Sequence, residues 1–432
     1  MKLDLSIFLK IFQHIVCFIL IIIIRLLRPF YLIKFDYSHS ERIGHFSGIN
    51  SIYAANRQKN LKKNDKNNYE FLIHSKIICN LQIEELLKSK INFLGNFFLP
   101  LIKFNSYFPG GKYHLIHYRE NYLDRRVIWE HRDINNDIKK YLPSFNFEEK
   151  KLKILKEEIE KIGISEKDKI IILNLRDDEF LKNIFKGNDF SYKTQNVEIN
   201  TYLRTVKELT KQGYKVIRAG LHHKTKLNFK DKNYIDLFTE NIRNDYIEMY
   251  LISRCLFQIG SYSGGSMPCF YLFNRPTIIT NQIPIIEFHS WSNNVFTIFK
   301  NVKDKIREKN ISLSEHFELM STNFGPRFMN GPIDNRYLKK NSRYNFFEEE
   351  NYKINDFEII DNSEQEIFDI TFEVLDKIEN KNTNTKCKEN IVFENIFKNN
   401  LNNFPNMWKF HPQNFNSSIG KKFLISNKNF LK

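Results

Sequence analysis

Apolar residues fall into continuous runs that alternate with segments in which about every third or fourth residue is apolar. The continuous runs predict strands, and the segments between them predict helices. Strands that are apolar on both faces and separated by helices are typical of a parallel sheet covered by helices on both sides. In the second half of the chain five such strands are predicted, at residues 169–175, 215–220, 233–238, 255–260 and 275–280.

The helices predicted around these strands are bounded by ordinary stop and start signals. Helix 148–163 ends at Gly163, and helix 200–213 ends at Gly213, because glycine adopts the backbone conformation that terminates a helix. The remaining predicted helices of this half are residues 245–254, 264–273, 309–320 and 363–381.

The first half of the chain shows the same alternation with less regular spacing. A polar stretch interrupts it at residues 60–70, which reads as a loop. The predicted elements are a strand at 31–37, a loop at 40–48, a helix at 49–60, a strand at 71–78 and a helix at 83–94.

A chain of 432 residues exceeds the roughly 250–300 residues over which a single core grows, so we expect two domains. The sequence predicts α/β domains with parallel sheets, because both halves alternate strand and helix. The segment from Lys381 begins as a polar stretch, and we expect a flexible surface tail. The predicted divisions are a hydrophobic helix at 1–34, a first α/β domain at 35–148, a second α/β domain at 149–380 and a tail at 381–432.

The N-terminal segment contains fourteen uncharged residues, 11–24, between Lys10 and Arg25. This run is shorter than the roughly 20 residues that cross a bilayer, although including Arg25 gives a marginal span. No small-residue cleavage site follows it, so a cleaved signal peptide is not indicated. We expect an interfacial or signal-anchor helix at a membrane, with a buried core helix as the alternative.

The overall charge and the cysteines bear on three questions: a nucleic-acid partner, the redox compartment and a zinc site. The formal net charge is +16, but the lysines are spread along the whole chain, and no zinc-finger spacing or aromatic RNA-binding motif accompanies them. Nucleic acid is therefore not an expected partner. Five scattered cysteines without a C-x-x-C pair indicate a reducing, cytoplasmic location and no zinc site.

Candidate binding residues follow the predicted strands of the second half. In an open parallel sheet, ligands bind at the carboxyl ends of the strands. Arginines at two of these ends suit a diphosphate, although a salt bridge with a neighbouring aspartate would explain them equally. The candidates at these positions are Arg176, Asp178, Arg218, Gly220 and Asp245. Asp245 also follows Asn244, a residue suited to cap the next helix.

Residues 260–268, here called the glycine-rich loop, join a strand to a helix with the sequence GSYSGGSMP. Backbone amides at such a helix start can bind phosphate, and glycine lets a ligand approach the backbone. Ordinary turn chemistry is the alternative. The candidate ligand contacts in this loop are Ser261, Ser263, Gly264 and Gly265. In the first half, His45 lies in the predicted loop 40–48 and is a candidate general base if the two domains face each other.

The chain resembles a family of bacterial glycosyltransferases of surface-polysaccharide biosynthesis, of the GT-B type with two facing Rossmann-like domains. The resemblance rests on seven blocks in the family's order. It departs from the family at Tyr192-Lys193-Thr194, where the family shows Tyr-Arg-Asn, and at Tyr262 in the glycine-rich loop. The blocks are RIGHF, LNLRD, LTKQGYKVIRAG, RNDYIEMYLISRCLFQIGSYSG, FNRPTIITNQIP, IIDNSEQEI and IGKKFLISN.

The resemblance implies sugar transfer from a nucleotide-sugar donor to a bacterial surface glycan such as lipopolysaccharide, O-antigen or capsule. It also implies donor contacts from Tyr192 and Lys193, and a reaction without metal or cofactor. His45 or Asp178 would deprotonate the acceptor, at the cytoplasmic face of the inner membrane. Two alternatives remain: a non-catalytic glycan-assembly protein that binds nucleotide sugar, and a transferase that uses another activated donor.

Overall fold

The chain forms two compact units in the computed structural model. One comprises Met1–His131 and Asp137–Asn146, and the other Arg132–Asn136 and Phe147–Lys432. Below they are called the N-terminal and the C-terminal unit. The structure describes residues 5–61, 68–117, 131–142, 145–177, 179, 193–221, 225–322, 353, 356–380, 386–403 and 405–432.

The described part of the N-terminal unit contains a small parallel sheet with strand order β1-β2-β3. Both strand pairs are parallel, in agreement with the predicted class of sheet. The elements of this unit are α1 (Leu5–Leu27), β1 (Leu32–Tyr37), α2 (Ile43–Leu61), β2 (Asn68–Ile73), α3 (Leu81–Lys88), β3 (Phe93–Leu94), η1 (Asn96–Phe98), α4 (Pro100–Asn105), η2 (Gly111–His114) and α6 (Asp137–Tyr141).

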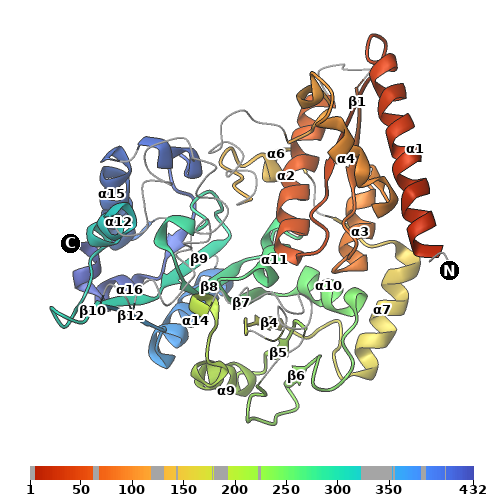
Figure 1. Ribbon diagram of the computed structural model, residues 1–432. Helices are drawn as coiled ribbons and strands as arrows, with labels where there is room; N and C mark the ends of the chain where they lie inside the picture. The colour runs from red at the N-terminus through yellow and green to blue at the C-terminus, as the bar shows by residue number, and fades with distance from the viewer. Residues whose placement is uncertain are drawn as a thin grey trace. The chain divides into compact units, whose positions relative to one another are not determined.

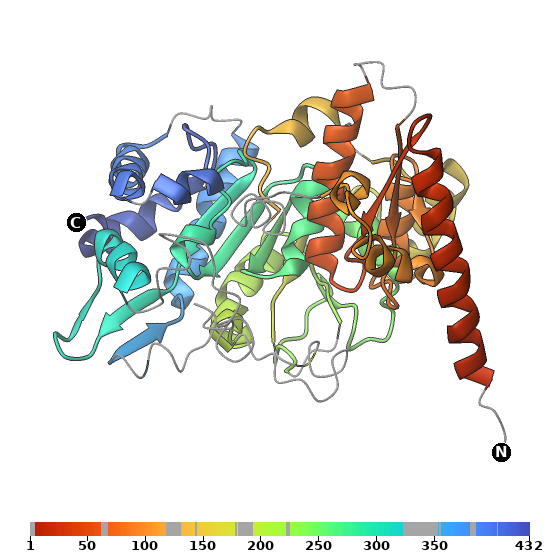
Figure 2. The ribbon, with the colours of Figure 1, turned by 45° about the horizontal axis from the view of Figure 1, so that its top comes forward.

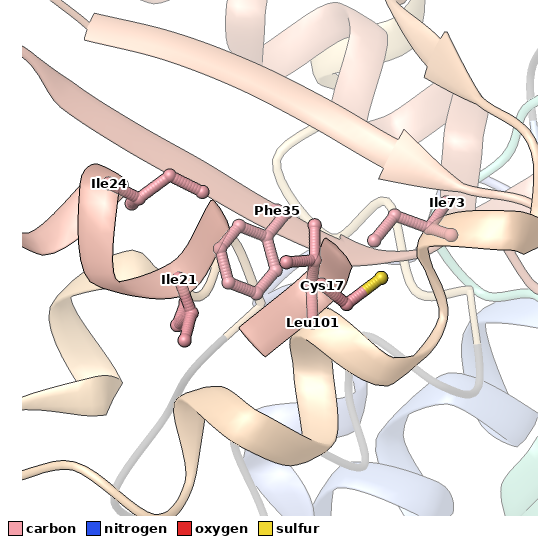
Figure 3. Close-up of a cluster of buried hydrophobic side chains, with 6 residues drawn as sticks. All are labelled: Cys17, Ile21, Ile24, Phe35, Ile73 and Leu101. Atoms are coloured by element: carbon pink, nitrogen blue, oxygen red, sulfur yellow. The ribbon is translucent and has the colours of Figure 1, made fainter. Parts of the chain in front are cut away.

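Helix α1 packs against one face of this small sheet. Its side chains Cys17 and Ile21 are fully buried, together with Phe35 of β1 and Ile73 of β2 (Figure 3). Helix α1 is also the one helix in the described part of the chain that is long and apolar enough to cross a membrane, over Ser6–Leu27. It therefore contributes to the core of the N-terminal unit and exposes apolar surface as well.

The C-terminal unit is built around a seven-stranded sheet, counted over the described residues, with order β13-β9-β8-β7-β4-β5-β6 (Figures 1 and 2). Every pair of neighbouring strands in it is parallel. The strands are β4 (Ile170–Asn174), β5 (Lys215–Arg218), β6 (Tyr234–Asp236), β7 (Phe257–Ser261), β8 (Thr277–Gln282), β9 (Val295–Phe299) and β13 (Ser418–Ile419).

The order of these strands is that of a doubly wound nucleotide-binding sheet. From β4 the chain proceeds outward through β5 and β6, then returns to the other side of β4 and proceeds through β7, β8 and β9. This is the Rossmann order 3-2-1-4-5-6, in which the direction of winding reverses between the first and the fourth strand. The reversal lies between β4 and β7, which pair directly.

Helices in the C-terminal unit lie close to their predicted positions. Helix α10 begins at Asp245 and ends at Arg254, as predicted, and the capping box at Ser363 starts α14. The others are α7 (Glu149–Lys161), η3 (Lys193–Gln195), η4 (Ile199–Tyr202), α9 (Leu203–Lys211), η5 (Gly264–Ser266), α11 (Met267–Tyr271), η6 (Ile285–Glu287), α12 (Leu313–Thr322), α14 (Glu364–Glu379), α15 (Lys388–Asn403), η8 (Pro405–Phe410), α16 (Lys421–Ser426) and η9 (Lys428–Leu431).

The prediction of a flexible tail from residue 381 is wrong for the described residues of that segment. Helix α15 buries Phe393 and Phe397, which contact Phe288, and β13 extends the large sheet beside β9 (blue in Figure 2). The apolar residues of this segment are thus part of the core. A small antiparallel sheet, which the sequence did not reveal, consists of β10 (Asn301–Asp304), β11 (Lys309–Asn310) and β12 (Phe357–Ile360).

The predicted loop at 40–48 is also wrong in part, because α2 already begins at Ile43. Gly44, Ser47 and Gly48 favour a loop by propensity. Burial of Phe46 outweighs that preference, and the Ser47 hydroxyl donates to the Ile43 carbonyl at 2.7 Å. His45 therefore lies in the first turn of a helix.

Candidate functional site

The candidate site lies at the carboxyl ends of β4 and β7, where the direction of winding reverses. Arg176 follows β4, and its backbone N–H donates to the hydroxyl of Ser261 at the end of β7, at 2.9 Å. Its guanidinium donates to the side chain of Gln195, and its carbonyl accepts from the N–H of Val197 at 3.2 Å. Arg176 is therefore held both by the end of β7 and by the segment that contains Gln195 and Val197.

The glycines of the glycine-rich loop are required by close packing. A Cβ at Gly265 would lie 2.4 Å from Oδ1 of Asn174, the last residue of β4. A Cβ at Gly260 would lie 2.1 Å from the hydroxyl of Ser266. Gly265 thus lets the loop pack against β4, and Gly260 makes room for Ser266 of the loop itself, so both glycines have a structural reason.

The same packing places the loop beside the end of β4. Ser261 and Tyr262 are buried, and Tyr262 donates its hydroxyl to Glu287 at 3.1 Å, so this unusual residue has a structural role. Ser263 and Gly264 are half-buried beside Gly265. The helix that follows is shorter than predicted, with the 3-10 turn η5 and the five residues of α11, and Pro268 lies in its first turn as expected. Its macrodipole is correspondingly small, so loop amides and side chains would have to provide most of the anion binding.

Arg218 lies at the same sheet edge but is buried. Its guanidinium donates to the Thr225 carbonyl at 2.7 Å and pairs with Asp236 at 3.2 Å. The salt-bridge alternative therefore describes Arg218, with Asp236 of the neighbouring strand as the partner. The adjacent Gly220 donates its N–H to Glu248 at 2.7 Å.

Asp245 is likewise engaged in local structure. Its carboxylate pairs with Arg243 at 2.9 Å, and Arg243 also binds Glu248 at 2.8 Å. The neighbouring Asn244 caps α10 by accepting from the Ile247 N–H at 2.7 Å, as predicted. These contacts fix the start of α10 near Gly220.

Two candidates, Asp178 and Tyr192, lie outside the described residues. Lys193 is described only as the first residue of η3. The neighbouring Gln195 was not a candidate, although it binds the Arg176 side chain. No sequence signal distinguishes it from other glutamines, because the bond depends on the fold.

A network of buried polar side chains connects strands of the large sheet to the start of α14. Asn281, near the end of β8, and Asn362, which precedes α14, each accept the backbone N–H of the other, at 2.6 and 2.7 Å. Asn362 also donates to the Phe299 carbonyl at 2.7 Å. Tyr202 binds both Asn281 and Thr280, and burial raises the pKa of its hydroxyl above the usual value. The network joins β8 and the end of β9 to α14 and η4.

We expect Asn362→Ala to lower the free energy of unfolding by about 2–4 kcal/mol, because it leaves a buried N–H and a buried carbonyl without their partners. Urea unfolding would measure the change. Asn380→Ala, at the exposed far end of α14, is the matched control and should cost less than about 0.5 kcal/mol. Equal losses for the two variants would contradict the role assigned to Asn362.

In the N-terminal unit, three histidines gather at the carboxyl end of β1. His45 Nδ1 lies 2.6 Å from His131 Nε2, and the ring of His39 is 6.0 Å from that of His45. Burial is the largest cause that lowers the pKa of His39. His131 was not a sequence candidate, because it is 86 residues away from His45.

Among the residues that the structure describes, no group of three or more histidine, cysteine, aspartate or glutamate side chains is arranged to hold a metal ion. All five cysteines are free thiols.

Comparisons with known proteins find only distant similarity. No family model matches the chain. No curated protein matches it either. Among solved structures, ADP-heptose LPS heptosyltransferase II of E. coli has a TM-score of 0.39 and 12% identity, covering 62% of this chain and 90% of that chain.

Two further solved structures are similar over the same share of this chain. A family 9 glycosyl transferase from Veillonella parvula has a TM-score of 0.39 and 9% identity, with 86% of that chain covered. TibC from enterotoxigenic E. coli, an iron-containing dodecameric glycosyltransferase, has a TM-score of 0.32, 12% identity and 62% of that chain covered. This similarity is too low to support a conclusion about the function of the present chain.

Proposed function

We propose that the protein is a glycosyltransferase of the GT-B type that binds a nucleotide-sugar donor at the carboxyl ends of β4 and β7. The observation that supports this proposal is the strand order, since doubly wound sheets bind nucleotides where the winding reverses. At that point the chain has a cationic side chain, Arg176, and the half-buried Ser263–Gly265 segment of the glycine-rich loop.

These groups suit the chemistry of glycosyl transfer. As the bond to the sugar breaks, negative charge builds up on the leaving diphosphate, and fixed donors aimed at it lower the barrier. The Arg176 guanidinium would bind the diphosphate together with the amides and hydroxyls of Ser263, Gly264 and Gly265, and Lys193 would add a further cation. Arg218 and Asp245 are not part of this proposal, since both are bound to neighbouring residues of their own unit.

The proposed acceptor is a bacterial surface glycan or its lipid-linked precursor, at the cytoplasmic face of the inner membrane. The apolar helix α1 and the five free thiols support a membrane surface in a reducing compartment. A metal-independent reaction follows from relying on cationic side chains at the diphosphate.

Calorimetric titration with a panel of nucleotide sugars tests this proposal, combined with an assay for slow donor hydrolysis. We expect one donor to bind and to be hydrolysed. Binding without hydrolysis would favour the non-catalytic glycan-assembly protein, and binding of an unrelated activated donor would favour another transferase. If no nucleotide compound binds, the proposal is wrong.

His45 is proposed as the base that accepts the proton of the acceptor hydroxyl. His45 Nδ1 lies 2.6 Å from His131 Nε2, and in the tautomer in which Nδ1 donates, Nε2 is the nitrogen that would accept the proton. We expect His45→Ala to lower kcat about 100-fold with little change in donor affinity, because it removes proton transfer alone. Added imidazole should restore part of the rate in steady-state assays. An unchanged kcat would exclude His45 as the base.

A further inference from the structure

Helix α1 has one face that belongs to the core of the N-terminal unit. Cys17 and Ile21 are 0% exposed, and they pack with Phe35, Ile73 and Leu101 (Figure 3). These β1 and β2 side chains would be uncovered if α1 left the sheet. The inner face of α1 is therefore a layer of the fold, because a parallel sheet needs both of its faces covered.

Polar contacts fix the helix along this face. The Gln13 side chain donates to the Phe97 carbonyl at 2.7 Å. Three turns later, Arg25 donates to the Asn105 side chain at 2.8 Å and to the Pro109 carbonyl at 2.9 Å. The helix is thus held to η1 and α4 at both ends of its buried stripe.

The outer face of α1 is apolar and exposed. Only 17% of its most apolar window is buried, unlike the core helix of a soluble protein. The surface continues onto α4, where the ring of Phe104 lies 5.6 Å from that of Phe18 and next to the exposed Tyr107. Exposed apolar surfaces of this extent mark binding sites. The outer-face residues, each 38% to 72% exposed, are Phe8, Ile11, Phe12, Ile15, Ile19, Ile22, Ile23 and Leu26.

Cations and tyrosines accompany this outer face. Arg28 lies over the ring of Tyr113 at 4.6 Å, and Lys112 lies over the same ring at 5.7 Å. Lys103 on α4 is exposed. Tyrosines beside an apolar surface are typical of the membrane interface, and clustered lysines and arginines are attracted to anionic lipid headgroups.

We propose that α1 lies in the plane of an anionic membrane, with its outer face in one leaflet and its inner face remaining in the core of the N-terminal unit. The inference deepens the membrane association proposed above and rests on it. Crossing the bilayer would instead remove Cys17 and Ile21 from the core and break the bonds of Gln13 and Arg25. For the same reason, deletion of the helix would damage the fold, and substitutions on the outer face are the better test.

Vesicle flotation of the full-length protein tests the surface. The vesicles contain phosphatidylcholine and about one quarter phosphatidylglycerol. Ile15→Asp combined with Ile19→Asp should weaken binding about 100-fold, because two isoleucine side chains that would be buried in the lipid are lost. The matched control is Ile154→Asp, an isoleucine 55% exposed on helix α7, which should bind as the parent does. Lys103→Glu with Lys112→Glu should remove most of the dependence on phosphatidylglycerol.

Quenching by brominated lipids distinguishes an in-plane helix from one that spans. Tryptophan is introduced in turn at Phe12, Ile19 and Leu26, which are exposed and spaced by seven residues on one face. An in-plane helix predicts equal, shallow quenching at all three positions. In a spanning helix the probes differ by about 10 Å in depth, and deep quenching at Ile19 alone would overturn the inference.

Two other outcomes would also overturn it. If the parent fails to float and instead dimerises through the outer face, with Ile15→Asp and Ile19→Asp restoring a monomer in ultracentrifugation, the partner is a second copy. If Ile154→Asp releases the protein as well, the outer face is not the binding surface. Hydrolysis of soluble donor should be unchanged in all these variants, so a failed membrane test leaves the proposed donor site to be judged separately.

Discussion

Arg176→Ala is expected to lower kcat/KM for sugar transfer about 100- to 1000-fold while the protein remains folded. This is the loss seen when one preorganised donor to a developing negative charge is removed. The guanidinium lies at the point where the winding of the sheet reverses, and its backbone is fixed by Ser261. The backbone bonds do not depend on the side chain, so they should persist in the variant.

Three comparisons separate this effect from a structural one. Arg204→Ala removes another arginine of the same unit that also binds a glutamine, Gln365, and it should leave the rate unchanged. Gln195→Ala removes the partner of Arg176 and should reduce the rate less than Arg176→Ala. Arg176→Lys should retain part of the activity, since lysine provides charge without bidentate geometry.

A lowered melting temperature would change the interpretation. If Arg176→Ala and Gln195→Ala both destabilise the protein to the same extent and reduce the rate only in proportion to the folded fraction, Arg176 serves to hold the segment around Gln195. The guanidinium would then have the structural role that the sequence left open, with a glutamine as its partner instead of Asp177 or Asp178.

Local signals explain why much of the C-terminal unit could be predicted. Strand β4 is a run of apolar residues, α10 starts after the cap Asn244, and α14 starts after the capping box of Ser363. Each of these features depends on residues within a few positions of each other. The sheet edge at which the candidate residues lie follows from the same elements.

The parts that could not be predicted depend on contacts between distant residues. Strand β13 has two residues, and only their pairing with β9 identifies them as a strand. Asn281 and Asn362 are 81 positions apart. Arg218 forms its salt bridge with Asp236, which belongs to another strand. Periodicity contains no information on such partners, so the ion pair of Arg218 with Asp236 could not be predicted.

The free energy of unfolding of the C-terminal unit is expected to fall steeply as the pH decreases from about 6.5 to about 4. Three buried histidines contribute, His289, His316 and His411, and burial lowers the pKa of His411 well below its usual value. Burial, followed by the charge of Arg132, lowers the pKa of His289 from 6.5 to about 3. Burial also lowers the pKa of His316 from 6.5 to about 4, against a smaller opposite effect of Glu315.

The direction of the effect follows from proton binding. Below pH 6.5 these histidines bind protons in the unfolded chain but remain neutral in the folded one, so acid favours unfolding. The stabilisation is fully present above pH 6.5 and is lost as the pH falls towards 3 or 4. At pH 4 His289 and His316 would each contribute about 3 kcal/mol of lost stability, so these two alone approach the total stability of a typical domain.

Urea unfolding between pH 4 and pH 7.5, followed by circular dichroism, would measure this loss. His289→Gln cannot take up the proton, so its stability should depend less on pH by about 3 kcal/mol over the range, whatever its stability at pH 7.5. His14→Gln changes an exposed histidine on α1 and should keep the parent's pH dependence. If His289→Gln loses stability in acid as steeply as the parent, protonation of His289 does not drive acid unfolding.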